Sequence, residues 1–281
     1  PKPSSSSVRA QLWARTLDEL GFGSPLLLTD GAAGRERILT ELERLIATST
    51  AGDQVVFQYA GHGIQLDDTD ADEDDALDEA ICPVDFADGA IIIDDDFAQV
   101  FARIPEGVSV TCFFDCCHSG QNTRLAVGRP GRAMGDARPR FMRATPDLQD
   151  RHRDFRARSG RRGLARSGDR SRMRQVVFSA CRPDEVAWES AGQGDFTRIA
   201  VPLLGRSLGL PHRRFAEALV QAFGAARRQT PELDCADGMR DQPLLGGVSS
   251  GGRGQAPGSG EGAEAWARVA EAIASALRAG R

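Results

Sequence analysis

Lysine is almost absent from this sequence of 281 residues: Lys2 is the only one, and every other basic residue is arginine. This bias is typical of a GC-rich genome and predicts a bacterial protein. No uninterrupted apolar run approaches the about 20 residues of a membrane-spanning helix, and the first residues lack the pattern of a secretory signal peptide. Six cysteines follow no disulfide-like spacing, and two of them are adjacent. We therefore expect a reducing, cytoplasmic location and no membrane partner.

The net charge of −5 conceals an uneven distribution of charge. The segment from Arg124 to Arg174 carries sixteen arginines and five aspartates, a local excess of +11, so the rest of the chain carries −16. This basic segment is compatible with a nucleic-acid footprint, but only Phe141 and Phe155 offer stacking and no nucleic-acid motif is present. We expect no nucleic-acid partner, and an inert linker is the plain alternative.

The hydrophobic pattern alternates between helices and short apolar strands. It predicts one α/β core, an α/β/α sandwich with a mostly parallel sheet between helices. Segment 121–174 has few apolar residues and no periodicity, so we expect it to be mobile and without regular structure. A Gly/Ser linker is expected at 246–262 and an amphipathic helix at 263–281. The predicted helices cover residues 8–20, 34–48, 94–103, 196–208 and 212–228, and the predicted strands 25–29, 54–60, 90–93, 108–115, 175–181 and 186–189.

Nucleophile-type residues follow two of these strands at the point where each strand ends. The strand that begins at Val108 stops in Asp115-Cys-Cys-His118, and the strand from Gln54 to Ala60 runs into His62 between two glycines. Open α/β folds place their sites at the carboxyl edge of the sheet. A thiol and an imidazole there form a nucleophile and its base. From the residues alone, a buried structural cysteine and a satisfied loop histidine stay open as the alternative.

Three motifs in this order resemble the metacaspase-type, caspase-like cysteine proteases. They are Tyr59-Ala-Gly-His-Gly63, Ile81-Cys-Pro-Val-Asp85 and Asp115-Cys-Cys-His-Ser-Gly120. The resemblance implies the caspase-hemoglobinase fold, with Cys117 as the nucleophile instead of Cys116 and His62 as the base. It also implies that the backbone N–H groups of Gly63 and Cys117 stabilise the oxyanion, and that His118 is not the base.

Asp115 is the residue that we expect to set specificity. A carboxylate two positions before the thiol lies on the same side of the strand and can receive the side chain that precedes the scissile bond. The resemblance implies arginine or lysine there, and arginine is favoured because its fork binds a carboxylate bidentately. Ala10 stands where the family adds a second acid in its first helix, so the pocket is expected to rely on Asp115. A buried aspartate that caps a turn is the alternative.

Calcium is the one cofactor that the resemblance suggests. Asp85, Asp94 and Asp95 match three of the family's four ligand positions, but Arg124 occupies the fourth. A guanidinium among three carboxylates weakens a calcium site, and Asp94 and Asp95 equally suit the N-terminus of a helix. We expect calcium-independent activity, with no cofactor required.

The family's division of the chain gives the basic segment a role. The resemblance implies a large-subunit-like catalytic half at 1–120, an activation or processing loop at 121–174 and a small-subunit-like half at 175–245, without the strand that opens the family's fold. The loop's arginines suit a tethered substrate, cut in cis or by an upstream protease. The expected partners are proteins with exposed arginines, and analogy with the family suggests a role in regulated death or antiphage defence. A non-catalytic scaffold that binds nucleic acid or an acidic partner through its basic loop is the alternative.

Overall fold

The computed structural model describes residues 4–23, 25–67, 77–117, 137–159, 173–190, 192–225 and 227–246. His118, Arg124, nearly all of the linker predicted at 246–262 and the helix predicted at 263–281 lie outside the described residues. Among the described helices, none is both long and apolar enough to cross a membrane.

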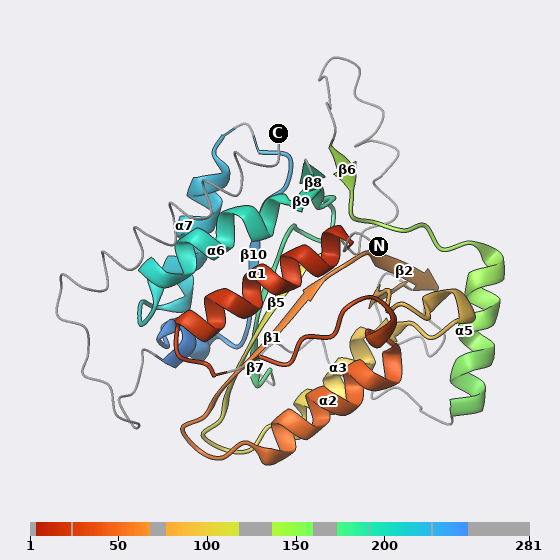
Figure 1. Ribbon diagram of the computed structural model, residues 1–281, viewed down its shortest axis with the longest axis horizontal. Helices are drawn as coiled ribbons and strands as arrows, with labels where there is room; N and C mark the ends of the chain where they lie inside the picture. The colour runs from red at the N-terminus through yellow and green to blue at the C-terminus, as the bar shows by residue number, and fades with distance from the viewer. Residues whose placement is uncertain are drawn as a thin grey trace.

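A four-stranded sheet in the order β1-β5-β7-β10 forms the centre of the fold (Figure 1). β1, β5 and β7 run parallel, and β10 is antiparallel to β7. β1 and β5 pair in register up to Ala60 opposite Asp115, so these two strands end side by side. The strands are β1 (Gln54–Ala60), β5 (Ser109–Asp115), β7 (Gln175–Ser179) and β10 (Glu232–Asp234).

Helices cover both faces of this sheet (Figure 1). Because successive side chains of a strand point to opposite faces, Phe113 lies in the core under the first group of helices and Phe114 in the core under the second. This arrangement confirms the predicted α/β/α sandwich with a mostly parallel sheet. The first group is α1 (Ser5–Glu19), α6 (Asp195–Ser207) and α7 (His212–Phe223), and the second is α2 (Arg35–Thr48) and α3 (Asp94–Phe101).

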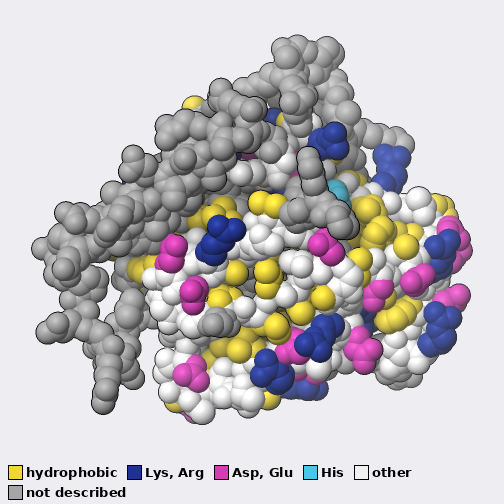
Figure 2. All heavy atoms as spheres, in the orientation of Figure 1, with side chains coloured by type: hydrophobic (Ala, Val, Ile, Leu, Met, Phe, Trp, Pro, Cys, Tyr) yellow, Lys and Arg dark blue, Asp and Glu magenta, His cyan; other side chains and the backbone are white. Residues whose placement is uncertain are grey.

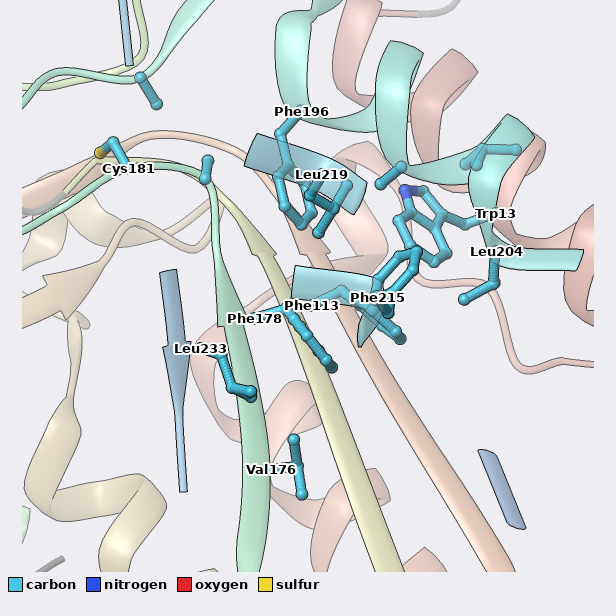
Figure 3. Close-up of a cluster of buried hydrophobic side chains, with 14 of the residues drawn as sticks. Trp13, Phe113, Val176, Phe178, Cys181, Phe196, Leu204, Phe215, Leu219 and Leu233 are labelled. Atoms are coloured by element: carbon cyan, nitrogen blue, oxygen red, sulfur yellow. The ribbon is translucent and has the colours of Figure 1, made fainter. Parts of the chain in front are cut away.

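Aromatic rings fill the first of these cores (Figure 3). Phe113 stacks on Phe178 at 5.3 Å between ring centroids, and Trp13 of α1 lies 4.6 Å from Phe113. Such pairs contribute about 0.5–1.5 kcal/mol each beyond the area they bury. The indole N–H of Trp13 donates to the hydroxyl of Thr197, 3.1 Å away. Packing thus fixes the first turn of α6 relative to the sheet.

Two small antiparallel sheets flank the ends of β1 and β5. One has the order β2-β3-β4 and the other β6-β8-β9. β2 begins directly after His62, so the histidine lies at the junction between the central sheet and the first small sheet. Their strands are β2 (Gly63–Asp67), β3 (Leu77–Ile81), β4 (Ile92–Ile93), β6 (Arg138–Pro139), β8 (Trp188–Ser190) and β9 (Gln193–Gly194).

Residues 25–29, predicted as a strand, do not form one. Leu26 and Leu27 are 55% and 38% exposed, and β1 is the edge of the central sheet on this side. An apolar run becomes a strand only when a neighbour completes its hydrogen bonds. No described strand lies beside this run, and the first described element is α1, so the family's opening strand is not among the described residues.

The expectation that segment 121–174 lacks regular structure is wrong for its middle part. Residues 138–139 form β6, and α5 spans Pro146–Ser159. Leu148 and His152 of α5 are buried, and the His152 Nδ1 lies 2.9 Å from the carbonyl oxygen of Gly89. The helix is almost wholly polar, so its docking depends on tertiary contacts that hydrophobic periodicity does not reveal. Residues 121–136 and 160–172 lie outside the described part of the chain.

Candidate active site

The two predicted catalytic residues follow neighbouring strand ends. Ala60 pairs with Asp115 across β1 and β5, and His62 and Cys117 each come two residues later. The backbones meet so closely here that a Cβ at Gly63 would collide with the carbonyl group of Cys117. Glycine is therefore required at position 63 for the close approach of the two backbones.

Cys117 is fully buried, and its thiol donates to the carbonyl oxygen of Glu185 at 2.9 Å. The thiol of Cys181 lies 3.5 Å from the same oxygen. A hydrogen bond with Cys117, followed by burial, raises the pKa of Cys181 well above its usual value. Cys116 packs instead into the core under α2 and α3. Of the two adjacent thiols, Cys117 is the one that faces the β8 side of the sheet.

His62 is exposed, yet its surroundings disfavour the charged imidazolium. Partial burial lowers its pKa from 6.5, and the nearby guanidinium of Arg140 lowers it further, while the Glu189 carboxylate acts in the opposite direction. A histidine with a lowered pKa is neutral at pH 7 and available to accept a proton.

Asp115 is fully inaccessible to solvent, and the space beside its carboxylate, which Arg140 fills, is called the pocket below. Its carboxylate accepts hydrogen bonds from the hydroxyl and the backbone N–H of Thr197, at 2.6 and 3.4 Å. A Cβ at Gly194 would collide with the same carboxylate, so glycine is needed where β9 meets α6. The first turn of α6 therefore holds Asp115 in place.

A second carboxylate and a buried arginine complete this pocket, and the sequence analysis missed both. The Glu189 carboxylate lies 3.3 Å from the Arg9 guanidinium, and Arg9 is 2% exposed. Burial, then repulsion by Arg140, lowers the pKa of Arg9 to about 10. Arg9 is next to Ala10, the position at which the family has a second acid. Here α1 contributes a cation to the pocket, and the second acid, Glu189, comes from β8.

Arg140 fills the pocket from within the same chain and is 1% exposed. Its guanidinium lies 3.6 Å from the carboxylates of both Asp115 and Glu189. Nη2 donates to the carbonyl oxygen of Gly61 at 2.9 Å. The carbonyl oxygen of Arg140 accepts from the backbone N–H groups of Gly63 at 3.2 Å and Cys117 at 3.4 Å. These are the two donors predicted to stabilise an oxyanion.

The comparisons with known proteins agree with this geometry. Residues 26–126, which include His62 and Cys117, match the model of the metacaspase, peptidase C14 domain. A metacaspase-1 of Coccidioides immitis is 42% identical over 87 residues, which cover 31% of this chain and 19% of that protein. Over these residues the chain is similar to the metacaspase-type, caspase-like proteins.

Solved structures resemble this metacaspase-like chain in fold over most of its length, beyond residues 26–126. A protein of Geobacter sulfurreducens superposes with a TM-score of 0.69 and 24% identity, over 88% of this chain and 91% of that one. Caspase-1 of Spodoptera frugiperda superposes with a TM-score of 0.55 and 11% identity, over 90% and 85%. The chain spans between about a fifth and a quarter of the length of the curated metacaspases it matches.

The aspartates suggested for calcium lie at the starts of two helices, α2 and α3. Both carboxylate oxygens of Asp85 accept from the backbone N–H of Arg35 at the start of α2, at 3.0 and 3.3 Å. Asp94 and Asp95 belong to the first turn of α3, where carboxylates favour the helix N-terminus. Within the described ranges, no three His, Cys, Asp or Glu side chains are grouped to hold a metal. The residues present therefore do not fit a calcium site, and no step is derived through one.

Calcium independence stays a prediction for this metacaspase-like chain. We expect excess chelator to change the rate of peptide cleavage by less than about twofold, because the Asp85 carboxylate already serves as a helix cap. The rate is to be measured in chelator and after calcium is added back in excess. A large loss that calcium reverses would contradict the prediction.

Several arginines of the basic segment are paired within the protein. On α5, Arg151 pairs with Asp147 and Arg153 with Asp150. Figure 2 shows basic and acidic side chains next to one another over this part of the surface. Paired charges attract a polyanion less than a continuous basic face does. The described part of the segment therefore does not favour a nucleic-acid footprint.

A cavity of about 360 Å³ between β3, α3 and β7 borders this site at Cys181, which hydrogen-bonds with Cys117. Its lining includes Glu79, Phe97 and Cys181, but not His62, Cys117 or Asp115. The candidate active site itself is not hollow, because Arg140 occupies the space between Asp115 and Glu189.

Proposed function

We propose that this chain is a cysteine endopeptidase that cleaves proteins after arginine, with Cys117 as the nucleophile and His62 as the base. One observation carries the proposal. The side chain of Arg140 lies between Asp115 and Glu189, while the carbonyl oxygen of the same residue accepts from the N–H groups of Gly63 and Cys117. The same arginine therefore has its side chain at the two carboxylates and its carbonyl oxygen at the two N–H groups that would polarise it.

The pocket suits arginine better than lysine. Nη2 of Arg140 donates a hydrogen bond to the Gly61 carbonyl oxygen, while Nε and Nη1 lie 3.6 Å from the carboxylates of Asp115 and Glu189 as ion pairs without hydrogen bonds. A lysine ammonium is a single point of charge and cannot reach all three from one position. Without an occupant, the charges of Asp115, Glu189 and Arg9 leave the pocket with a net charge of −1, which favours the entry of a cation.

The proposed reaction follows from the positions of these groups. The Cys117 thiol turns away from the carbonyl of Glu185 and gives its proton to His62, and the thiolate attacks the carbonyl carbon of the bound arginine itself. The N–H groups of Gly63 and Cys117 stabilise the oxyanion as it forms. His62 returns the proton to the departing amine, and water then hydrolyses the thioester to release a carboxylate and the free thiol.

Hydrolysis of matched fluorogenic peptides tests the proposal. We expect the arginine peptide to be cleaved at least about tenfold faster than its lysine counterpart and its uncharged citrulline isostere to be almost inert, because one good interaction with a charged group contributes about 1.5–3 kcal/mol. Cys117→Ala should abolish cleavage, whereas Cys116→Ala, its neighbour in the opposite core, should retain it. Equal rates for the arginine and citrulline peptides, or activity that survives Cys117→Ala, would refute the proposal.

The lowered pKa of His62 predicts how the rate depends on pH. Only the neutral imidazole accepts a proton, so a pKa below the ordinary 6.5 moves the acid limb of the rate to lower pH. Once Arg140 has left the pocket, kcat/KM reports the enzyme with an empty pocket and kcat reports the complex with a substrate arginine in it, so the limb of kcat should lie below that of kcat/KM. Steady-state kinetics between about pH 4.5 and 8 would reveal this order; a kcat limb above pH 6.5 would contradict it.

The same proposal includes activation by cleavage in the Arg-rich segment. A cut between the large-subunit-like half, 1–120, and the small-subunit-like half, 175–245, would release the pocket for other proteins with exposed arginines. We place this activity in a bacterial cytoplasm, in regulated death or antiphage defence, by analogy with the family alone. The scaffold alternative gains no support from the described contacts.

A further inference from the structure

Two cysteines follow the ends of neighbouring strands in the central sheet. β5 and β7 run parallel and pair in register as far as Phe114 opposite Ser179, and the N–H of Ala180 donates to the carbonyl oxygen of Phe114 at 2.9 Å. Cys117 comes three residues after Phe114, and Cys181 comes two residues after Ser179, past the aromatic core (Figure 3). Neighbouring strands lie about 4.8 Å apart, within the about 4.4–6.8 Å that a disulfide usually spans between Cα atoms. The backbone therefore suits a bond between these two side chains.

One backbone oxygen holds both thiols. The carbonyl oxygen of Glu185 accepts from the Cys117 thiol at 2.9 Å and lies 3.5 Å from the sulfur of Cys181. The two cysteine side chains also hydrogen-bond with each other. Glu185 is itself fixed, because its carboxylate accepts from the hydroxyl of Thr230 at 2.9 Å. The two sulfurs are therefore in contact before any bond forms between them.

Cys116 and Cys82 form a second, separate pair of neighbouring thiols. Cys116 packs into the core under α2 and α3, on the opposite face of the sheet from the core that includes Cys117. Burial, then the nearby Cys116, raises the pKa of Cys82 to about 12. A Cys82–Cys116 bond is therefore the alternative pairing that an experiment has to exclude.

The cavity between β3, α3 and β7 gives a small oxidant a route to the thiols. Cys181 lines this cavity, and so do the exposed residues Arg182 and Pro183, so the cavity reaches the surface. Its volume of about 360 Å³ is far larger than the about 30 Å³ that a water molecule occupies, and hydrogen peroxide is little larger than water. Cys181 thus lies between the fully buried Cys117 and a space that a hydroperoxide can enter.

We propose that a hydroperoxide oxidises Cys117 and that Cys181 captures the product as a Cys117–Cys181 disulfide, which a thiol reductant reverses. His62 takes the Cys117 proton, the thiolate attacks one oxygen of hydrogen peroxide, the oxygen–oxygen bond breaks, and the departing hydroxide takes the proton from His62. The Cys181 sulfur then attacks the sulfenic sulfur, and the hydroxide that leaves takes the Cys181 proton. Two thiols lose two electrons in total, and one hydrogen peroxide becomes two waters.

The protonation states set the order of these steps. The hydrogen bond with Cys117, then burial, keeps the pKa of Cys181 well above its usual value, so Cys181 stays a thiol at neutral pH. The thiolate is the reactive form of cysteine, so Cys117, which His62 deprotonates, is oxidised first.

The disulfide suspends activity and protects the nucleophile. A Cys117 sulfur bonded to Cys181 cannot attack a substrate, and this effect on activity rests on the proposed function. A sulfenic acid that no thiol captures proceeds to sulfinic acid, which reductants do not reverse. Cys181 thus converts an irreversible loss into a reversible one.

Disulfide mapping of the full chain tests the proposal. The protein is treated with hydrogen peroxide, the remaining thiols are blocked with N-ethylmaleimide, and the chain is digested with trypsin without reductant. Trypsin leaves Cys181 in peptide 175–198 and Cys117 in peptide 104–124. The second peptide contains two further cysteines, so Cys117→Ala and Cys116→Ala are mapped in parallel with wild type.

We expect wild type and Cys116→Ala to yield the two peptides linked, and Cys117→Ala and Cys181→Ser to yield them separate. Serine keeps a donor for the Glu185 carbonyl oxygen, so Cys181→Ser preserves the local hydrogen bond. A link that persists in Cys117→Ala, a bond between Cys82 and Cys116 in its place, or no link in wild type would overturn the inference.

Recovery of arginine-peptide cleavage provides the second readout. After excess peroxide, dithiothreitol should return wild type and the control Cys82→Ser to within about twofold of their untreated rates, whereas Cys181→Ser should stay at least about tenfold below its own, because its Cys117 becomes the sulfinic acid. Peptide 104–124 of Cys181→Ser should then carry two added oxygens. Full recovery of Cys181→Ser would contradict the inference.

The mapping does not require peptidase activity, so the two proposals fail separately. A wild-type chain that forms the Cys117–Cys181 bond but cleaves no arginine peptide upholds the bond and refutes the proposed function. A chain that cleaves the peptide but forms no such bond refutes this inference alone.

Discussion

Asp115→Asn is expected to lower kcat/KM for an arginine peptide by about 10²- to 10³-fold. The substitution keeps the shape of the side chain and removes the charge that faces the guanidinium. Asp115 is fully buried, and loss of one member of a buried charge pair costs about 2–5 kcal/mol, much of it from the partner left unpaired. Glu189 retains part of the attraction, so cleavage should be strongly reduced instead of lost. The rate of alkylation of Cys117 by a small reagent should change little.

Asp195→Asn is the matched control for this variant. Asp195 is a buried aspartate in the same first turn of α6, but its ion pairs are with Arg228 and Arg198 on the outer side. Both variants are to be compared in the Arg140→Gln background, so that displacement of Arg140 does not contribute to the difference. An Asp115→Asn enzyme that cleaves arginine peptides as fast as the Asp195→Asn enzyme would show that Asp115 does not recognise the substrate.

Arg35→Met is expected to lower the free energy of unfolding by about 3–5 kcal/mol, because it breaks a buried ion pair and leaves Asp96 partly uncompensated. Arg35, the first residue of α2, donates to the Asp96 carboxylate at 2.7 Å and to the carbonyl oxygen of Ile91 at 3.0 Å. Its guanidinium lies over the ring of Phe155 on α5, 5.2 Å from the centroid. The loss corresponds to about 10 °C in Tm for a domain of this size.

Arg37→Met provides the control on the same helix. Arg37 is exposed and, among the residues that the structure describes, pairs with Glu41 alone, one turn further along; exposed pairs contribute about 0–1 kcal/mol. Urea unfolding followed by circular dichroism would measure both variants. Because Arg35 and Asp96 hold α5, protease digestion should also reach residues 146–159 sooner in Arg35→Met. A loss of stability equal to that of Arg37→Met would contradict the account of α5 docking.

Local pattern was sufficient to predict the strand ends that carry the candidate catalytic pair. An apolar run such as Val108–Asp115 has to be buried, and a buried strand that stops in polar residues brings them to the edge of the sheet. The same argument applied to His62. Neighbouring parallel strands end at one edge, so the sequence also predicted that His62 and Cys117 follow adjacent strands. Their catalytic roles stay predictions.

The pattern was misleading where structure depends on a partner distant in sequence. Residues 25–29 have the composition of a strand, but a strand also needs hydrogen bonds from a neighbour. α5 has the opposite character, since its sequence is almost wholly polar and its position depends on the ion pairs of Asp96 with Arg35 and Arg156. The local sequence of residues 25–29 does not show that no strand lies beside them. The local sequence of α5 does not show that Asp96 holds the helix in place.

The pocket shows most clearly which features follow from the sequence and which depend on the tertiary structure. The chain by itself determined an α/β sandwich, a thiol and an imidazole at its edge, and a carboxylate two residues before the thiol. Only the tertiary structure decided that Glu189 is the second acid, that Arg9 is a resident cation and that Arg140 is the occupant. The reason is physical, because charges act through space. Arg9, Asp115 and Glu189 come from α1, β5 and β8, and Arg140 follows β6; folding places Arg9 3.3 Å from Glu189, and Arg140 3.6 Å from both carboxylates.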